Sequence, residues 1–248
     1  MRLAGKVAII TGGGAGFGEG MAKRFAQEGA KVVVADLNAE AAKRVAADIG
    51  ESAHPIAVDV VKAQDNAAMV QAATETFGGL DIFVLNAGTT HKNMGLLDVS
   101  DADFDRITGV NMKALFYASK TVVPAMAARG GGSILATAST AGLRPRPGLV
   151  WYNASKAWVI NACKCMAVEL APQNIRVNSL CPVAGETAML SDFMGEDTPE
   201  IRERFKSVIP LGRFSQPRDM ANAALYLCSD EADFITGVAL EVDGGRCV

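Results

Sequence analysis

Two residues four positions apart, Tyr152 and Lys156, have the types and spacing needed for acid–base chemistry. They stand at the start of a run, Trp151 to Leu170, whose composition predicts a helix. A spacing of four residues places both side chains on one helical face, one turn apart. An ammonium group beside a phenol favours the phenolate by charge attraction, so we expect Lys156 to lower the pKa of Tyr152 below its ordinary value of about 10.

A third polar residue, Ser139, follows an apolar run from Ser133 to Ala138 that reads as a strand. Its hydroxyl group is placed to bind the same reacting oxygen atom as Tyr152. A tyrosine and a lysine at this spacing also occur together by chance, usually on a solvated helix face. The catalytic interpretation therefore depends on what the rest of the chain provides.

A glycine-rich turn near the amino terminus provides the first support. The apolar run from Lys6 to Thr11 has the pattern of a buried parallel strand, and Gly12, Gly16 and Gly18 follow it before a predicted helix. A strand, a glycine turn and a helix amino terminus together form a site for a pyrophosphate, because glycines let the backbone approach the phosphates. A merely flexible turn is the alternative.

Asp36 ends the second predicted strand, Lys31 to Ala35, about twenty residues after the glycines. A carboxylate at this position is suited to the ribose hydroxyl groups of an adenine nucleotide and would repel a 2′-phosphate. The sequence therefore predicts NAD rather than NADP. The alternative role is an N-cap for the helix that begins near Asn38, and the two roles are compatible.

Strands and helices alternate along the whole chain, which predicts an α/β fold with a doubly wound parallel sheet and helices on both faces. Besides the two strands above, the predicted strands are 55–58, 81–85, 133–138, 175–181 and 238–242. We expect a single domain, residues 1–248, with a substrate loop inserted at about 183–216, where the periodic pattern is lost.

Composition excludes several classes of function. A formal net charge of −3 provides no basic surface for nucleic acid. No apolar run is long enough for a membrane span, and the amino terminus does not read as a signal peptide, so we expect a cytoplasmic protein. The five cysteines are odd in number and lack a metal-binding spacing, so we expect small core residues and no metal site.

Taken together, these motifs resemble the short-chain dehydrogenase/reductase family over essentially the whole chain. Gly12-x-x-x-Gly16-x-Gly18 is similar to the cofactor loop of the family, and Asn86-Ala87-Gly88 to its fourth-strand motif. The family's catalytic tetrad matches Asn111, Ser139, Tyr152 and Lys156. The resemblance implies a seven-stranded Rossmann sheet, a nicotinamide cofactor and hydride transfer between a secondary alcohol and a ketone or aldehyde.

The resemblance also implies a role for each residue. Tyr152 would exchange a proton with the substrate oxygen, Lys156 would lower the pKa of Tyr152 and hold the nicotinamide ribose, Ser139 would position the substrate oxygen, and Asn111 would support a water relay. The cofactor-binding residues implied are Gly12, Gly16, Phe17, Gly18, Asp36, Leu37, Asp59, Val60, Asn86, Ala87, Gly88, Tyr152, Lys156, Pro182, Gly185 and Thr187.

Two residues depart from the family pattern. Val183 replaces a glycine, and because valine resists positive φ, the local backbone path is expected to differ from that of the family. Leu85 precedes Asn86 where a second asparagine is more common, which we consider minor.

Three alternatives remain open from the sequence. The closest is a 3-oxoacyl-acyl-carrier-protein reductase that uses NADP(H), although Leu37 after Asp36 leaves no evident phosphate clamp. A catalytically silent nucleotide-binding protein would have no need of an intact tetrad. The third, a structural subunit, is disfavoured for the same reason. Small apolar residues on segments 114–128 and 158–170 lead us to expect a homotetramer.

Two arginines before the predicted catalytic helix suggest the chemical class of the substrate. Arg144 and Arg146 lie between Ser139 and Tyr152, so their segment must pass beside the pocket. A guanidinium group matches a carboxylate, sulfonate or phosphate, which predicts an anionic or strongly polar substrate. A solvated surface turn and an oligomer contact are the alternatives.

Overall fold

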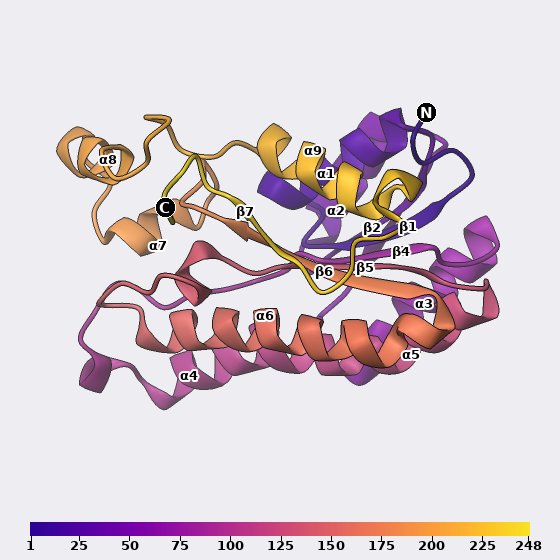
Figure 1. The fold of residues 1–248 in the computed structure, drawn as a ribbon, viewed down its shortest axis with the longest axis horizontal. Helices are drawn as coiled ribbons and strands as arrows, with labels where there is room; N and C mark the ends of the chain where they lie inside the picture. The colour runs from indigo at the N-terminus through magenta and orange to yellow at the C-terminus, as the bar shows by residue number, and fades with distance from the viewer.

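The computed structural model describes residues 1–248 and contains one seven-stranded sheet in which every pair of neighbouring strands is parallel. The strand order is β3-β2-β1-β4-β5-β6-β7 (Figure 1). The strands are β1 Val7–Thr11, β2 Lys31–Asp36, β3 Ala53–Ala57, β4 Ile82–Leu85, β5 Gly132–Thr137, β6 Ile175–Pro182 and β7 Ala239–Val242. The predicted fold class is confirmed, and strand bounds differ from expectation by one or two residues.

Helices cover both faces of the sheet, as Figure 1 shows. One core packs α3 Ala63–Phe77, α5 Ala114–Ala128 and α6 Val150–Leu170 under the sheet, and the other packs α1 Gly16–Gln27, α2 Ala39–Ile49 and α9 Pro217–Cys228 above it. Neighbours on a strand enter opposite cores, as Ile9 and Ile10 do on β1, because strand side chains alternate between the two faces. None of the helices combines the length and the apolar character that a bilayer crossing requires.

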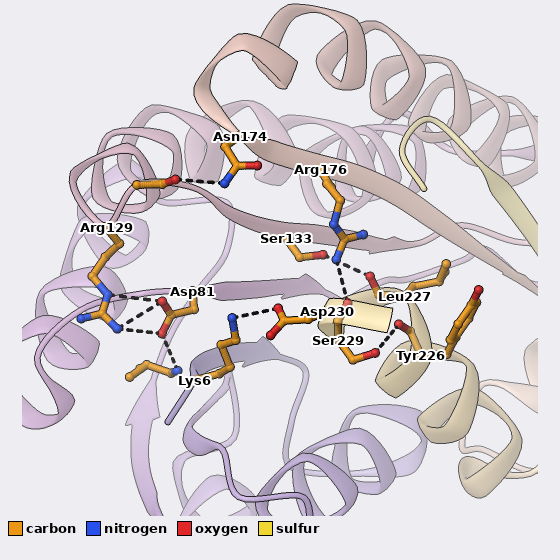
Figure 2. A network of polar contacts seen from close by, with 12 residues as sticks. Lys6, Asp81, Arg129, Ser133, Asn174, Arg176, Tyr226, Leu227, Ser229 and Asp230 are labelled. Carbon is orange, nitrogen blue, oxygen red and sulfur yellow. Dashed lines mark hydrogen bonds and ion pairs between the residues drawn. The ribbon is translucent and has the colours of Figure 1, made fainter. Parts of the chain in front are cut away.

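Ion pairs and hydrogen bonds hold the amino ends of the strands (Figure 2). The Asp81 carboxylate accepts a hydrogen bond of 2.8 Å from the Val7 backbone N–H and pairs with the Arg129 guanidinium at 3.2 Å. The side chain of Arg176 donates to the carbonyl oxygens of Ser229 and Ile235. These contacts tie β1, β4 and β6 to helix and loop ends at the edge opposite the predicted site, so their role is structural.

The segment expected to be irregular contains two short helices, α7 Leu190–Met194 and α8 Pro199–Lys206. Both lie beyond the carboxyl ends of the strands, beside the chain's carboxyl terminus (Figure 1). Four side chains of the segment form a small core of their own: Leu190, Met194, Ile209 and Phe214. The prediction of an irregular loop is wrong to that extent, because helices of this length contain too few turns to show a periodic pattern.

Candidate active site

Three of the four tetrad residues line one cavity of about 1090 Å³ at the carboxyl edge of the sheet. Ser139 follows β5, while Tyr152 and Lys156 project from the first turns of α6. All three side chains are buried, with exposed fractions of 5 to 8%. The sheet and α6 therefore bring together groups that the sequence separates by up to 17 positions.

Asn111 is buried beside this cavity but does not line it. It lies in a turn of π-helix, Thr108–Lys113, that joins α4 Asp101–Ile107 to α5. Its amide nitrogen donates to the Thr89 carbonyl oxygen and to the Ser155 hydroxyl, and its amide oxygen accepts from the Thr89 N–H, each at 2.9 Å. These hydrogen bonds fix the loop after β4 against α6.

The Lys156 ammonium lies near a backbone carbonyl oxygen and the ring of Tyr152. The ammonium donates a 2.8 Å hydrogen bond to the Thr137 carbonyl oxygen at the end of β5. Its nitrogen also lies 5.8 Å from the centroid of the Tyr152 ring. Burial disfavours the charged form and lowers the pKa of Lys156 to about 8.

Tyr152 packs against Phe193 of α7, with the two ring centroids 5.2 Å apart. Burial raises the pKa of Tyr152 to about 12, and the Ser139 hydroxyl and the Arg146 guanidinium oppose that rise. The expectation that neighbouring groups lower this pKa is therefore wrong in its net direction, because removing a phenolate from water costs more than they return. At neutral pH Tyr152 keeps its proton and can act as a hydrogen-bond donor to a substrate oxygen.

The glycine turn is shaped by close backbone approaches. Gly12 and Gly16 adopt positive φ of 62° and 54°. A Cβ on Gly18 would collide with the carbonyl oxygen of Gly12, so Gly18 permits the turn without lining the cavity. The Asn86 amide donates to the carbonyl oxygens of Thr11 and Gly12 at 3.1 and 3.2 Å, which ties the turn to the end of β4.

Apart from Gly18, every residue assigned to cofactor binding lines the same cavity. These residues come from the ends of β2 and β6, from the start of α1, from the first turns of α6 and from the loops that follow the strands. They are Gly12, Gly16, Phe17, Asp36, Leu37, Asp59, Val60, Asn86, Ala87, Gly88, Tyr152, Lys156, Pro182, Gly185 and Thr187. Their common location is the carboxyl edge at which open parallel sheets bind ligands.

Asp36 faces the glycine turn. One carboxylate oxygen accepts from the Gly14 N–H and the other from the Asn38 N–H, each at 2.9 Å. The alternative N-cap role is wrong, since Asn38 caps α2 by accepting from the Glu40 and Ala41 N–H groups. Asp36 is left as an oriented carboxylate at one end of the cavity.

The segment from Pro182 to Thr187 crosses the cavity close to the glycine turn. Val183 does not adopt positive φ, so the replacement of the family's glycine is accommodated without backbone strain. A Cβ on Gly16 would lie 3.2 Å from the Thr187 methyl group, which shows how closely the two segments approach.

The two arginines of the loop before α6 differ in their contacts. Arg144 donates to the backbone carbonyl oxygens of Arg246 and Val248 at 2.9 and 3.4 Å. The Arg146 guanidinium lies 4.5 Å above the centroid of the Phe205 ring. Both line the cavity, as does Arg246, which the sequence analysis missed because nothing in the sequence brings the carboxyl terminus to this site.

Comparison with known proteins agrees with this geometry. The family model described as enoyl-(acyl carrier protein) reductase matches residues 12–246, nearly the whole chain. The chain belongs to the short-chain dehydrogenase/reductase family. The match runs from the glycine turn of this short-chain dehydrogenase/reductase to its carboxyl-terminal tail.

Three relatives of this short-chain dehydrogenase/reductase illustrate the range of the family. A 4-formylbenzenesulfonate dehydrogenase of Comamonas testosteroni is 50% identical, over 99% of both chains. The structure of a 3-ketoacyl-(acyl-carrier-protein) reductase from Brucella melitensis complexed with NADH matches with a TM-score of 0.94 and 49% identity, covering 99% of this chain and 100% of that one. A 7α-hydroxysteroid dehydrogenase complexed with NADH and 7-oxo glycochenodeoxycholic acid matches with a TM-score of 0.91 and 39% identity, covering 98% and 95%.

The buried ammonium of Lys156 has a measurable consequence for stability. Between its folded pKa of about 8 and an unfolded value of about 10.4, the unfolded state binds a proton that the folded state does not, so stability rises with pH. We expect the wild type to gain up to about 3 kcal/mol relative to Lys156→Met between pH 8 and 10.5. Urea unfolding across this range measures it.

The buried thiols also titrate in this pH range. Because both proteins contain them, their contribution cancels in the difference between the two free energies of unfolding. Lys164→Met, at an exposed lysine of α6, is the matched control for loss of a lysine from this helix. A constant difference between wild type and Lys156→Met across the range would contradict the lowered pKa of Lys156.

Proposed function

We propose that this short-chain dehydrogenase/reductase is an NAD(H)-dependent oxidoreductase that interconverts an alcohol and the corresponding ketone or aldehyde. One observation carries the proposal. The side chains of Ser139, Tyr152 and Lys156 line the same cavity as the glycine turn and Asp36. Proton-transfer groups and a dinucleotide cradle in one cavity are what a nicotinamide-dependent oxidoreductase requires.

The residues of the cavity fit a nicotinamide dinucleotide. Gly12 and Gly16 form a backbone cradle at positive φ, where a Cβ would lie 3.0 and 3.2 Å from neighbouring atoms. Asp36 presents a carboxylate for ribose hydroxyl groups. Lys156 and Thr187 line the cavity as candidates for the nicotinamide end. When bound, the cofactor supplies or accepts the hydride.

The chain's own groups would handle the proton and the oxygen atom. The hydroxyl groups of Ser139 and Tyr152 bind the substrate oxygen, and Tyr152 donates its proton as a carbonyl oxygen becomes a hydroxyl. The adjacent Lys156 ammonium favours the phenolate that remains. In alcohol oxidation the phenolate takes the proton back. Phe193, which packs on Tyr152, helps to exclude water from the site.

NAD is proposed over NADP because the charges beside the glycine turn leave no free partner for a 2′-phosphate. Asp36 would repel a phosphate, and both terminal nitrogens of Arg44 are bonded to the Glu19 carboxylate, at 2.7 and 3.0 Å. The two solved relatives described above carry NADH, which supports the same choice.

Carbonyl compounds with an aryl body are the first substrates to try. The 50% identical relative is named for an aryl aldehyde that carries a sulfonate group. Reduction of 3-oxoacyl thioesters is the second candidate function, because the 49% identical solved relative is named for that reaction. Turnover of acetoacetyl thioesters, compared with aryl aldehydes at equal concentration, discriminates between the two.

We also propose a homotetramer. Large apolar side chains stand exposed on the helices that cover one face of the sheet, among them Phe104 on α4, Phe116 on α5, and Trp158 and Val168 on α6. Such a surface is suited to self-association about a two-fold axis. Light scattering that gave the single-chain mass of 25.9 kDa at micromolar concentration would contradict this.

Removal of the Tyr152 hydroxyl tests the proposed reaction. Tyr152→Phe keeps the ring against Phe193 but lacks the transferable proton, so we expect kcat to fall by at least about a hundredfold while NADH affinity stays within about threefold. Tyr226→Phe, outside the cavity on α9, is the matched control. Residual activity above about a tenth of wild type would remove Tyr152 from its role.

Cofactor preference tests the role of Asp36. With any accepted substrate, we expect kcat/KM to favour NADH over NADPH by at least about tenfold, because the carboxylate repels the extra phosphate. Asp36→Asn should narrow that preference mainly by improving the use of NADPH, whereas Asp101→Asn, at an exposed carboxylate outside the cavity, should not. Equal or better use of NADPH by the wild type would refute the assignment.

A further inference from the structure

The substrate end of the cavity carries positive charge only. We define this end by the lining residues of segments 141–149 and 188–208 together with the carboxyl-terminal tail. Every lining residue there is apolar except three arginines, Arg144, Arg146 and Arg246. No carboxylate from these segments faces the cavity to neutralise them.

Arg146 is positioned but unpaired. Its backbone carbonyl oxygen accepts a 2.8 Å hydrogen bond from the Asn153 amide, which ties the loop to α6 beside Tyr152. Its guanidinium stacks on the Phe205 ring and has no ion pair or hydrogen-bond partner in the chain. Burial and the nearby charge of Arg246 lower the pKa of Arg146. Its charge in turn opposes the rise in the pKa of Tyr152 that burial causes, so the guanidinium and the Tyr152 hydroxyl act on one another.

Arg246 is brought to the same place by an ordered tail. The Asp243 carboxylate accepts from the backbone N–H groups of Gly245 and Cys247, each at 2.8 Å. Arg144 donates a 2.9 Å hydrogen bond to the carbonyl oxygen of Arg246, which anchors the backbone of that residue. Because this bond involves the Arg246 backbone, the Arg246 side chain remains free to line the cavity.

The two guanidinium groups have no counter-ion and repel each other, and one of them is stacked and largely buried. This arrangement raises the electrostatic free energy of the empty cavity, and a bound anion would lower it. We propose that Arg146 and Arg246 together bind an anionic group of the substrate, and that Arg144 is the residue that positions Arg246. The substrate class is then a carbonyl compound with a carboxylate or sulfonate at one end of an apolar, ring-sized body. Phe193, Phe205 and Met189 line the surface that such a body would contact.

This inference rests on the proposed function for its turnover assay but not for its binding assay. In the first, purified enzyme with NADH is offered 4-formylbenzoate, 4-formylbenzenesulfonate and the neutral 4-formylbenzamide. In the second, calorimetry measures the binding of benzoate and benzenesulfonate, which cannot react. The two anions distinguish a carboxylate site from a sulfonate site.

We expect Arg146→Met and Arg246→Met each to lower kcat/KM for the charged aldehydes by about 10- to 100-fold, mainly through KM, and to change the neutral amide by less than about threefold. Arg146→Lys and Arg246→Lys should recover part of the loss. Arg144→Met should raise KM for the charged aldehydes alone. Arg204→Met, at an exposed arginine of α8 outside the cavity, is the matched control.

Failure of the inference and failure of the proposed function are separable. Equal use of charged and neutral aldehydes by the wild type, or equal losses on both in the arginine variants, would overturn the anion site while the oxidoreductase stands. Anion binding by the wild type that is lost in Arg146→Met and Arg246→Met, without turnover of any aldehyde, would support the site and count against the proposed reaction. Absence of both turnover and anion binding would overturn the inference.

Discussion

The 2.8 Å hydrogen bond from the Lys156 ammonium to the Thr137 carbonyl oxygen joins α6 to the end of β5. A buried ammonium group is expensive to desolvate, so it is tolerated only where backbone oxygens and neighbouring dipoles are already fixed in place. Here β5 provides the oxygen, and α6 brings Tyr152 to the same point, one turn earlier. The position of Ser139, two residues beyond Thr137, follows from the same strand end.

The cavity beside Lys156 and Thr137 has two ends whose lining residues carry opposite charges. Asp36 and Asp59 line it at the carboxyl ends of β2 and β3, whereas Arg144, Arg146 and Arg246 line the substrate end. Carboxylates are suited to the hydroxyl groups of a ribose and guanidiniums to an anion. In the function that we propose, Asp36 and Asp59 would recognise the ribose, and the arginines would recognise an anionic group of the substrate.

Much of this arrangement could be predicted from the sequence, for physical reasons that particular residues show. Buried parallel strands are apolar on both faces, so runs such as Lys31 to Ala35 could be recognised directly. The glycine turn and the pair Tyr152 and Lys156 were recognisable because backbone clearance and a four-residue helical spacing are local properties, whereas the role of Asn111 came from the family resemblance. Their common placement follows from the parallel sheet, in which strand carboxyl ends share one edge.

What could not be predicted depends on burial and on contacts between distant segments. The sequence places Lys156 beside Tyr152 but does not reveal how far both are desolvated, and it is desolvation that raises the pKa of Tyr152 to about 12. Arg246 lies one hundred positions from Arg146, so only the folded tail brings the two together. Arg144 and Arg146 look equivalent in the sequence, and their contacts alone separate an anchoring residue from an unpaired one.

The central claim is that this cavity transfers hydrogen between a nicotinamide cofactor and a carbonyl carbon. The most direct measurement uses NADH dideuterated at C4 of the nicotinamide, with the aldehyde that the enzyme reduces fastest, and mass spectrometry of the alcohol formed. We expect one deuterium atom on the carbinol carbon of each product molecule and no exchange with solvent. An alcohol without deuterium, or no consumption of NADH with any carbonyl compound offered, would contradict the account.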